Sequence, residues 1–220
     1  MSTANRSLYL ANTIDVLKRH WPDNRTVNVV CHGHSVPAGY FATPMVDTLN
    51  AYPHLLHVGL KHLFPFSVVN VIVTAIGGEN SESGAKRFRE DVLDKRPDII
   101  TIDYGLNDRG IGLVKSKASW EGMIKAASAL EIKVILLTPT ADATQSPTGE
   151  ENGKRQLAEH AEQIRQLAAA HEVGLADSFA AFHEYMKTGT LSDLLSWSNH
   201  PNRQGHDLVA RELLRWFPMA

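Results

Sequence analysis

Cysteine is nearly absent from this chain, since Cys31 is the only one among 220 residues. A single cysteine excludes an intramolecular disulfide and a zinc site built on several thiolates. Because Cys31 stands in an apolar run, we expect it to pack as a small hydrophobic residue. No low-complexity tract, linker or internal repeat interrupts the chain. We therefore predict one domain over residues 1–220, with residues 1–25 as an N-terminal helical extension.

An excess of one charge is also absent, because 22 basic and 24 acidic residues of both signs are interspersed along the chain. This balance does not suggest a nucleic acid or an anionic membrane as a partner. The first residues lack a basic stretch followed by an apolar run, and no later segment is long and apolar enough to span a bilayer. We expect a cytoplasmic protein with a small-molecule substrate; its oligomeric state stays open.

Apolar runs and helical patterns alternate along the chain. The runs typical of buried strands fall near 27–32, 67–74, 98–104, 132–138 and Val173 to Ala176, and helical patterns cover Leu8 to His20 and about 46–63, 82–95, 118–130, 151–171 and 203–216. Parallel neighbouring strands need long crossovers, and strands rich in Val, Ile and Leu are buried on both faces. The pattern predicts an α/β fold: a three-layer α/β/α sandwich with a flavodoxin-like parallel sheet of about five strands.

Four residues stand where a predicted strand or loop leads into the next element: Ser35, Gly78, Asn107 and His200. Ligands of open parallel sheets bind beyond the carboxyl ends of the strands, so the first three should converge on one pocket. A loop ahead of the last helix can return His200 to the same edge. A nucleophile, two oxyanion donors and a base could therefore meet there.

Each residue also has a simpler interpretation. Ser35 could cap the turn after its strand, Gly78 and Asn107 could serve turns, and a lone histidine is usually structural. Together they favour the catalytic interpretation: Ser35 as nucleophile, His200 as base, and Gly78 and Asn107 as oxyanion donors. We expect Asp108 to organise its loop.

Cofactor sites are not favoured by the motifs. The glycines around Gly78 match neither dinucleotide nor phosphate-loop spacing, which leaves a nucleotide-binding module as a third hypothesis. His32 and His34 could bind a metal ion as a His-x-His pair, but no Asp or Cys ligand is close in sequence. We predict neither a metal nor another cofactor.

These motifs resemble those of the SGNH, or GDSL-like, hydrolase family. Gly33-His34-Ser35 resembles its Gly-Asp-Ser block, Gly105-Leu106-Asn107-Asp108 its Gly-x-Asn-Asp block, and Gly78 and His200 its conserved glycine and histidine, over roughly residues 27–216. The resemblance implies esterase chemistry without metal, Ser35 as nucleophile, His200 as base, and an oxyanion hole formed by the N–H groups of Ser35 and Gly78 and the side chain of Asn107.

Two residues depart from that family pattern. His34 replaces the aspartate of the nucleophile block, and Trp197 stands three residues before His200, where the family has the triad aspartate. Indole cannot accept a hydrogen bond from imidazole, whereas a backbone carbonyl can. The resemblance extends to carbohydrate acetylesterases with a Ser-His dyad of that kind. We expect the carbonyl of Ser196 or Trp197 to orient the base, with Asp193 or Asp142 as alternative partners.

Aromatic residues are few, at 7% of the chain, but several fall near these loops. Tyr40, Phe41, Tyr104 and Trp197 could face a sugar ring or an acyl chain, and we predict Tyr104 and Trp197 as substrate-binding residues. The expected function is hydrolysis of small-acyl esters, acetyl foremost, with a carbohydrate as the candidate alcohol. The alternative is a catalytically silent ligand-binding protein on the same scaffold.

Overall fold

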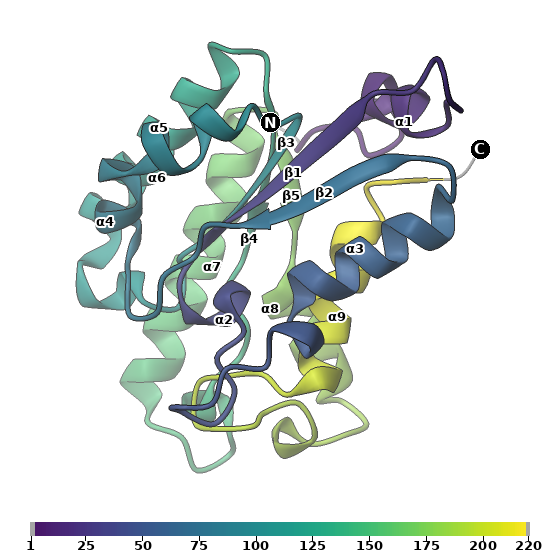
Figure 1. The fold of residues 1–220 in the computed structure, drawn as a ribbon. Helices are drawn as coiled ribbons and strands as arrows, with labels where there is room; N and C mark the ends of the chain where they lie inside the picture. Colours follow the sequence, from purple (N-terminus) through teal and green to yellow (C-terminus); the bar gives the residue numbers. More distant parts are fainter. Residues whose placement is uncertain (1–2, 219–220) are drawn as a thin grey trace.

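A parallel sheet forms the centre of the computed structural model, which describes residues 3–218 (Figure 1). Its strands are β1 (Thr26–Gly33), β2 (Val68–Val73), β3 (Ile99–Asp103), β4 (Lys133–Leu137) and β5 (Gly174–Ala176). They lie in the order β2-β1-β3-β4-β5, and every neighbouring pair is parallel. The predicted five-stranded parallel sheet is thereby confirmed.

Alternate residues of the strands enter two separate cores. In β1, Val29 and Cys31 pack into one core, whereas Val30 packs into the other. In β3, Ile99 belongs to the first core and Ile100 to the second. Because side chains of a strand point alternately to opposite faces, such apolar runs require a cover on each face of the sheet.

Helices form the two outer layers. The layer around the first core contains α1 (Ala11–Leu17), α3 (Tyr52–Leu63), α8 (Ser178–Tyr185) and α9 (Arg203–Leu214). The layer around the second contains α4 (Ser81–Lys86), α5 (Phe88–Asp91), α6 (Gly112–Ser128) and most of α7 (Glu151–Ala170). The short α2 (Ser35–Ala38) follows β1 directly. This is the predicted α/β/α sandwich, and the organisation of residues 1–220 as one domain stays a prediction.

Several helical segments differ from the sequence prediction: α6 begins at Gly112 rather than near residue 118, and α2 was not predicted. The helix expected at 46–63 begins only at Tyr52, where Pro53 suits its first turn. The helix expected at 82–95 breaks at Arg87, whose side chain instead binds the carbonyl of Thr74. The short helix α8 was not predicted; it begins where the Asp177 side chain accepts a hydrogen bond from the Ala180 N–H. At Arg87 a contact with the loop after β2 decides the boundary, whereas the Asp177 cap of α8 is a local signal that the sequence prediction overlooked.

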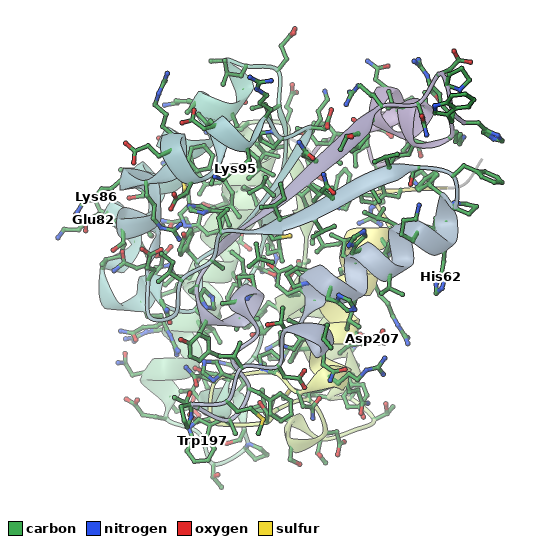
Figure 2. All side chains as sticks on the ribbon, in the orientation of Figure 1. His62, Glu82, Lys86, Lys95, Trp197 and Asp207 are labelled. Atoms are coloured by element: carbon green, nitrogen blue, oxygen red, sulfur yellow. The ribbon has the colours of Figure 1, made fainter. Side chains whose placement is uncertain are left out.

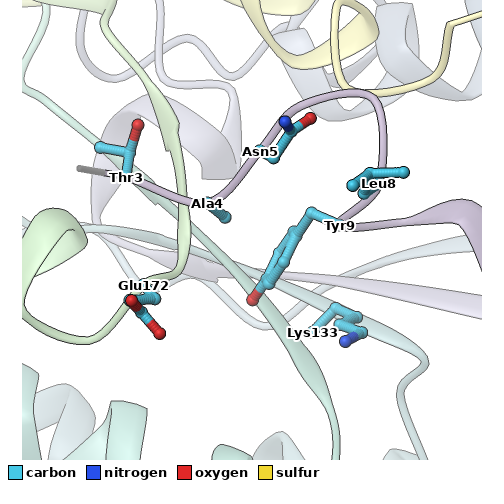
Figure 3. A pocket seen from close by; sticks show the side chains of 7 residues that line it. All are labelled: Thr3, Ala4, Asn5, Leu8, Tyr9, Lys133 and Glu172. Atoms are coloured by element: carbon cyan, nitrogen blue, oxygen red, sulfur yellow. The ribbon is translucent and has the colours of Figure 1, made fainter.

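The N-terminal segment covers the amino end of the sheet, far from the loops discussed below. The α1 residues Ile14 and Leu17 are buried in the first core, and the Tyr9 hydroxyl hydrogen-bonds the main chain of Val134 in β4. A hollow of about 360 Å³ lies beside Tyr9, with Lys133 and Glu172 on its wall (Figure 3). Among residues 3–218, every helix is too short or too polar to cross a membrane. Residues 1–2 of the predicted extension lie outside the described part.

Candidate active site

The turn between β1 and α2 presents Ser35. The strand ends at Gly33, where a Cβ would collide with the main chain of Asp103 in β3, so only glycine fits. The next residue, His34, has a non-helical backbone and caps α2: its Nδ1 accepts a hydrogen bond of 3.2 Å from the Val36 N–H. Ser35 thus occupies the first position of the short helix, at the carboxyl end of the sheet.

The Ser35 hydroxyl contacts His200. The Nε2 atom of His200 lies 3.0 Å from Oγ of Ser35, although 165 positions separate the two residues. His200 comes from the loop before α9, which lies beside the loop that follows α2 (Figure 1). A neutral imidazole at this distance can take the serine proton. Burial lowers the pKa of His200, which keeps the ring neutral and able to act as a base near pH 7.

The partner of His200 Nδ1 is the carbonyl oxygen of Phe41, at 2.9 Å. A carbonyl oxygen only accepts hydrogen bonds, so the Nδ1 atom carries the proton and Nε2 keeps its lone pair toward Ser35. The expectation of a carbonyl partner holds, but its predicted source was wrong. The loop around Ser196 turns the other way, because the N–H of Ser196 donates to the carbonyl of His200 itself.

Neither alternative carboxylate contacts His200. Asp142 accepts hydrogen bonds from the N–H of Thr144 and from the guanidinium of Arg109. Asp193 caps a short turn by accepting from the N–H of Thr190. Both carboxylates are engaged in holding loops, so the imidazole of His200 is held by a main-chain carbonyl rather than by a carboxylate.

The loop after β2 supplies a main-chain donor at Gly78. This residue has a φ of 82°, a conformation that side chains other than glycine rarely adopt, although a Cβ would meet open space there. Within the described residues, the N–H groups of Gly78 and Ser35 take no hydrogen-bond acceptor. Both are therefore available to a developing negative charge.

Asn107 lies against the same loop. Its side-chain Nδ2 donates to the carbonyl of Glu79 at 2.8 Å, which fixes the amide and leaves its second N–H proton available. The neighbouring Asp108 is fully buried and accepts from the N–H of Ser81 and from the indole of Trp120 at 2.6 Å. Asp108 thus connects the Asn107 loop to the start of α4, in agreement with its expected organising role.

Tyr104 does not lie at a surface that substrate could reach, so its predicted role in substrate binding was wrong. Its side chain is fully buried and packs against Gly84, and its hydroxyl lies 3.1 Å from Nε2 of His32. The same hydroxyl lies beside Arg87, whose guanidinium binds the carboxylate of Glu79 at 2.9 Å. Through Arg87, the buried Tyr104 side chain therefore supports the loop that carries Gly78 and Glu79.

Trp197 lies at the surface beside the loop of His200, with its side chain 58% exposed (Figure 2). It borders a mainly apolar hollow of about 440 Å³, whose other residues include Pro147, Leu191 and Leu195. The carbonyl of Ser198 accepts from the N–H of Ala143, which joins this wall to the loop after β4. An exposed indole beside a hollow can stack on the face of a ligand ring.

The nitrogens of His32 and His34 already have protein neighbours. Nδ1 of His32 lies 2.9 Å from the Thr74 hydroxyl and its Nε2 lies 3.2 Å from the carbonyl of Gly84. Nδ1 of His34 accepts from Val36, as described above. Within residues 3–218, no three His, Cys, Asp or Glu side chains gather as a metal site would require.

Two residues that lie beside His200 are missing from the predicted site residues. Phe41 acts through its carbonyl, which no side-chain pattern reveals. The sequence prediction names Tyr40 only among several aromatic residues, yet its ring centroid lies 6.0 Å from that of His200 and its ring lies against Gly77, next to Gly78. The aromatic pair Tyr40-Phe41 soon after Ser35 is a sequence signal for Tyr40, whereas the contact of the Phe41 carbonyl has none.

Comparison with known proteins identifies a family and several related structures. A profile of the GDSL-like Lipase/Acylhydrolase family matches residues 31–208. The acetylxylan esterase of Geobacillus stearothermophilus is 26% identical over 171 residues, covering 71% of this chain and 75% of that protein. A crystal structure of a catalytic mutant of an acetylxylan esterase from that organism has a TM-score of 0.78 at 21% identity, over 92% of this chain and 97% of its own. An alpha/beta hydrolase from the metagenome of Lake Arreo, Spain, gives a TM-score of 0.71 at 20% identity, over 87% and 94%.

Proposed function

Because this chain belongs to the GDSL-like lipase/acylhydrolase family and is a serine carboxylic ester hydrolase, we propose that it removes acetyl groups from an acylated carbohydrate. The observation that carries the mechanism is the line from Ser35 Oγ through His200 to the carbonyl of Phe41. The acetyl and carbohydrate specificity is supported by the similarity to an acetylxylan esterase. The exposed indole of Trp197 offers a face for the sugar.

In this mechanism Oγ of Ser35 attacks the ester carbonyl carbon while its proton passes to Nε2 of His200. The resulting imidazolium keeps its Nδ1–H on the carbonyl of Phe41, whose dipole stabilises the charge less than a carboxylate would. The oxyanion accepts from the N–H groups of Ser35 and Gly78 and from the Asn107 amide. Collapse of the intermediate expels the sugar alcohol, which receives the proton from His200.

Deacylation repeats these steps with water. His200 takes a proton from the water molecule that attacks the acetyl-enzyme, and the same donors hold the second oxyanion. Ser35 then leaves with the proton returned by His200, and acetate is released. No step of this proposed mechanism uses a metal ion or another cofactor.

Steady-state hydrolysis of p-nitrophenyl acetate, butyrate and octanoate, beside acetate release from acetylated xylo-oligosaccharides, tests the proposal. We expect the highest kcat/KM on acetyl esters and loss of measurable turnover in Ser35→Ala with unchanged thermal unfolding, because the hydroxyl forms the acyl-enzyme. Wild-type-like turnover in Ser35→Ala would refute the assignment of the nucleophile. Binding of the oligosaccharide without turnover by wild type would instead favour a silent ligand-binding protein.

The compartment is also part of the proposal. We place the protein in the cytoplasm, where a buried lone thiol such as Cys31 stays reduced. Immunoblotting of cell fractions tests this, and recovery of the protein outside the cytoplasmic fraction would refute it.

A further inference from the structure

A second imidazole lies next to Ser35, on His34. Its Nδ1 atom is 3.4 Å from Oγ of Ser35, and its Nε2 atom is 3.5 Å from a carboxylate oxygen of Asp103. The side chain of His34 is 1% exposed and that of Asp103 is 4% exposed. His34 therefore lies between the nucleophile and a buried carboxylate that the mechanism above does not use.

The proton on His34 can be placed from its neighbours. Nδ1 accepts the Val36 N–H, so the proton of the neutral ring is on Nε2, the atom that faces Asp103. Within the described residues, Nε2 has no hydrogen-bond partner of ordinary length. The Asp103 carboxylate lies 3.5 Å from that atom without forming a hydrogen bond of ordinary length, and its negative charge favours this tautomer over the other.

Asp103 is held beside His34 by the main chain as well. It ends β3 directly opposite Gly33 in the register of the sheet, and its carbonyl accepts the N–H of His34 at 3.2 Å. The Gly33 position lacks a Cβ, which lets the two chains approach closely. The carboxylate is therefore a rigid part of the same turn that presents Ser35.

We propose that Asp103 and His34 form a positioning pair for Ser35, in which the carboxylate keeps the proton on Nε2 of His34 so that Nδ1 can accept the Val36 N–H. That hydrogen bond holds the first turn of α2, which sets the direction of both Oγ and the N–H of Ser35. This inference rests on the proposed function, because it takes Ser35 as the nucleophile. The pair occupies the place of the family aspartate that His34 replaces.

Loss of the carboxylate has a defined consequence. With Asp103→Asn, the neutral amide can present either its oxygen or its N–H to Nε2, so it no longer favours protonation of Nε2 as the carboxylate charge does, and part of the rings can carry the proton on Nδ1. A protonated Nδ1 faces the Val36 N–H, so two donors oppose each other and the turn must shift. By contrast, in His34→Asn the Oδ1 atom of asparagine can replace Nδ1 as the acceptor of the Val36 N–H. An asparagine side chain has no tautomers, so Asp103 cannot act on it in this way.

A double-mutant cycle with ester hydrolysis as the readout tests the pair. We expect Asp103→Asn to lower kcat about tenfold in wild type with little change in KM, since residues that act through each other are energetically coupled. We expect the same substitution to have no further effect in the His34→Asn background. Asp98→Asn, which changes a carboxylate at the opposite end of β3, serves as the matched control and should leave kcat unchanged.

Nitrogen-15 NMR of histidine-labelled protein reads the tautomer directly, with His34→Asn identifying the signals. We expect a protonated Nε2 in wild type and a measurable share of rings with a protonated Nδ1 in Asp103→Asn. An equal loss of kcat from Asp103→Asn in both backgrounds, unchanged kcat in wild type, or a protonated Nδ1 in wild type would each overturn the inference. If wild type hydrolyses no ester, the proposed function fails, whereas the NMR result still decides the pair.

Discussion

Replacing Asp142 or Asp193 by asparagine distinguishes a base oriented by main chain from one oriented by an acid. In the structure Nδ1 of His200 donates to the carbonyl of Phe41, and neither carboxylate contacts the ring. Neither substitution removes a partner of His200. We therefore expect kcat to stay within about tenfold of wild type in both variants.

The two possible outcomes differ widely in size. Loss of a true triad aspartate lowers kcat by about ten-thousandfold, which raises the barrier by about 5 kcal/mol. Stability should respond differently from kcat in Asp142→Asn, because Asp142 is buried and paired with Arg109. Leaving that guanidinium without its partner costs about 3 kcal/mol of folding stability, or a fall in Tm of roughly 10 °C.

The assay is kcat for p-nitrophenyl acetate at a temperature well below the Tm of each variant, beside a thermal melt of the same sample. Asp193→Asn, whose carboxylate lies at the surface, is the comparison that should change neither quantity much. A thousandfold or greater collapse of kcat in one variant, at a temperature where it is fully folded, would refute the main-chain orientation of His200 and identify the missing acid.

Four further outcomes are expected. Asn107→Ala should lower kcat about a hundredfold or more, because one oxyanion donor is lost; a change confined to KM would mark Asn107 as a binding residue instead. Trp197→Asp should not raise kcat by more than about twofold, since the Phe41 carbonyl already accepts from Nδ1 of His200; a large gain would show that the carbonyl is a poor substitute for the family acid. EDTA should leave hydrolysis unchanged, and recovery of lost activity by added zinc would contradict this. Burial lowers the pKa of His32 and His160 to about 4 and of His206 to about 3, below the 6.5 of a free histidine. As the pH falls, the unfolded chain therefore binds these protons before the folded protein does. The contribution of these histidines to the free energy of unfolding is fully present above about pH 6.5, and each histidine should lower that free energy by about 2 kcal/mol between pH 7 and pH 5. Urea unfolding at both values checks this: His206→Asn should reduce the difference, and equal stability of wild type at both would refute it.

The layered fold was readable from the chain because its cause is local. Runs such as Val29-Val30-Cys31 and Ile99-Ile100 are apolar at every position, and a strand of that kind is stable only when both faces are covered. The positions of Ser35, Gly78 and Asn107 followed from the same pattern, because residues after parallel strands share one edge of the sheet. Family resemblance added the roles of these residues and of His200.

Tertiary structure alone decided which partners these residues meet. The carbonyl of Phe41 is the partner of His200 because the loop after α2 brings it there. Every residue has a main-chain carbonyl, so the sequence does not distinguish this one from those of Ser196 and Trp197. Tyr104 was placed correctly at the end of its strand, yet its side chain turned inward to the second core. The sequence by itself thus determined the layers and the edge where the site lies, because periodicity and burial act over a few residues. Contacts across 100 or more positions, such as that between Ser35 and His200, exist only once the chain is folded.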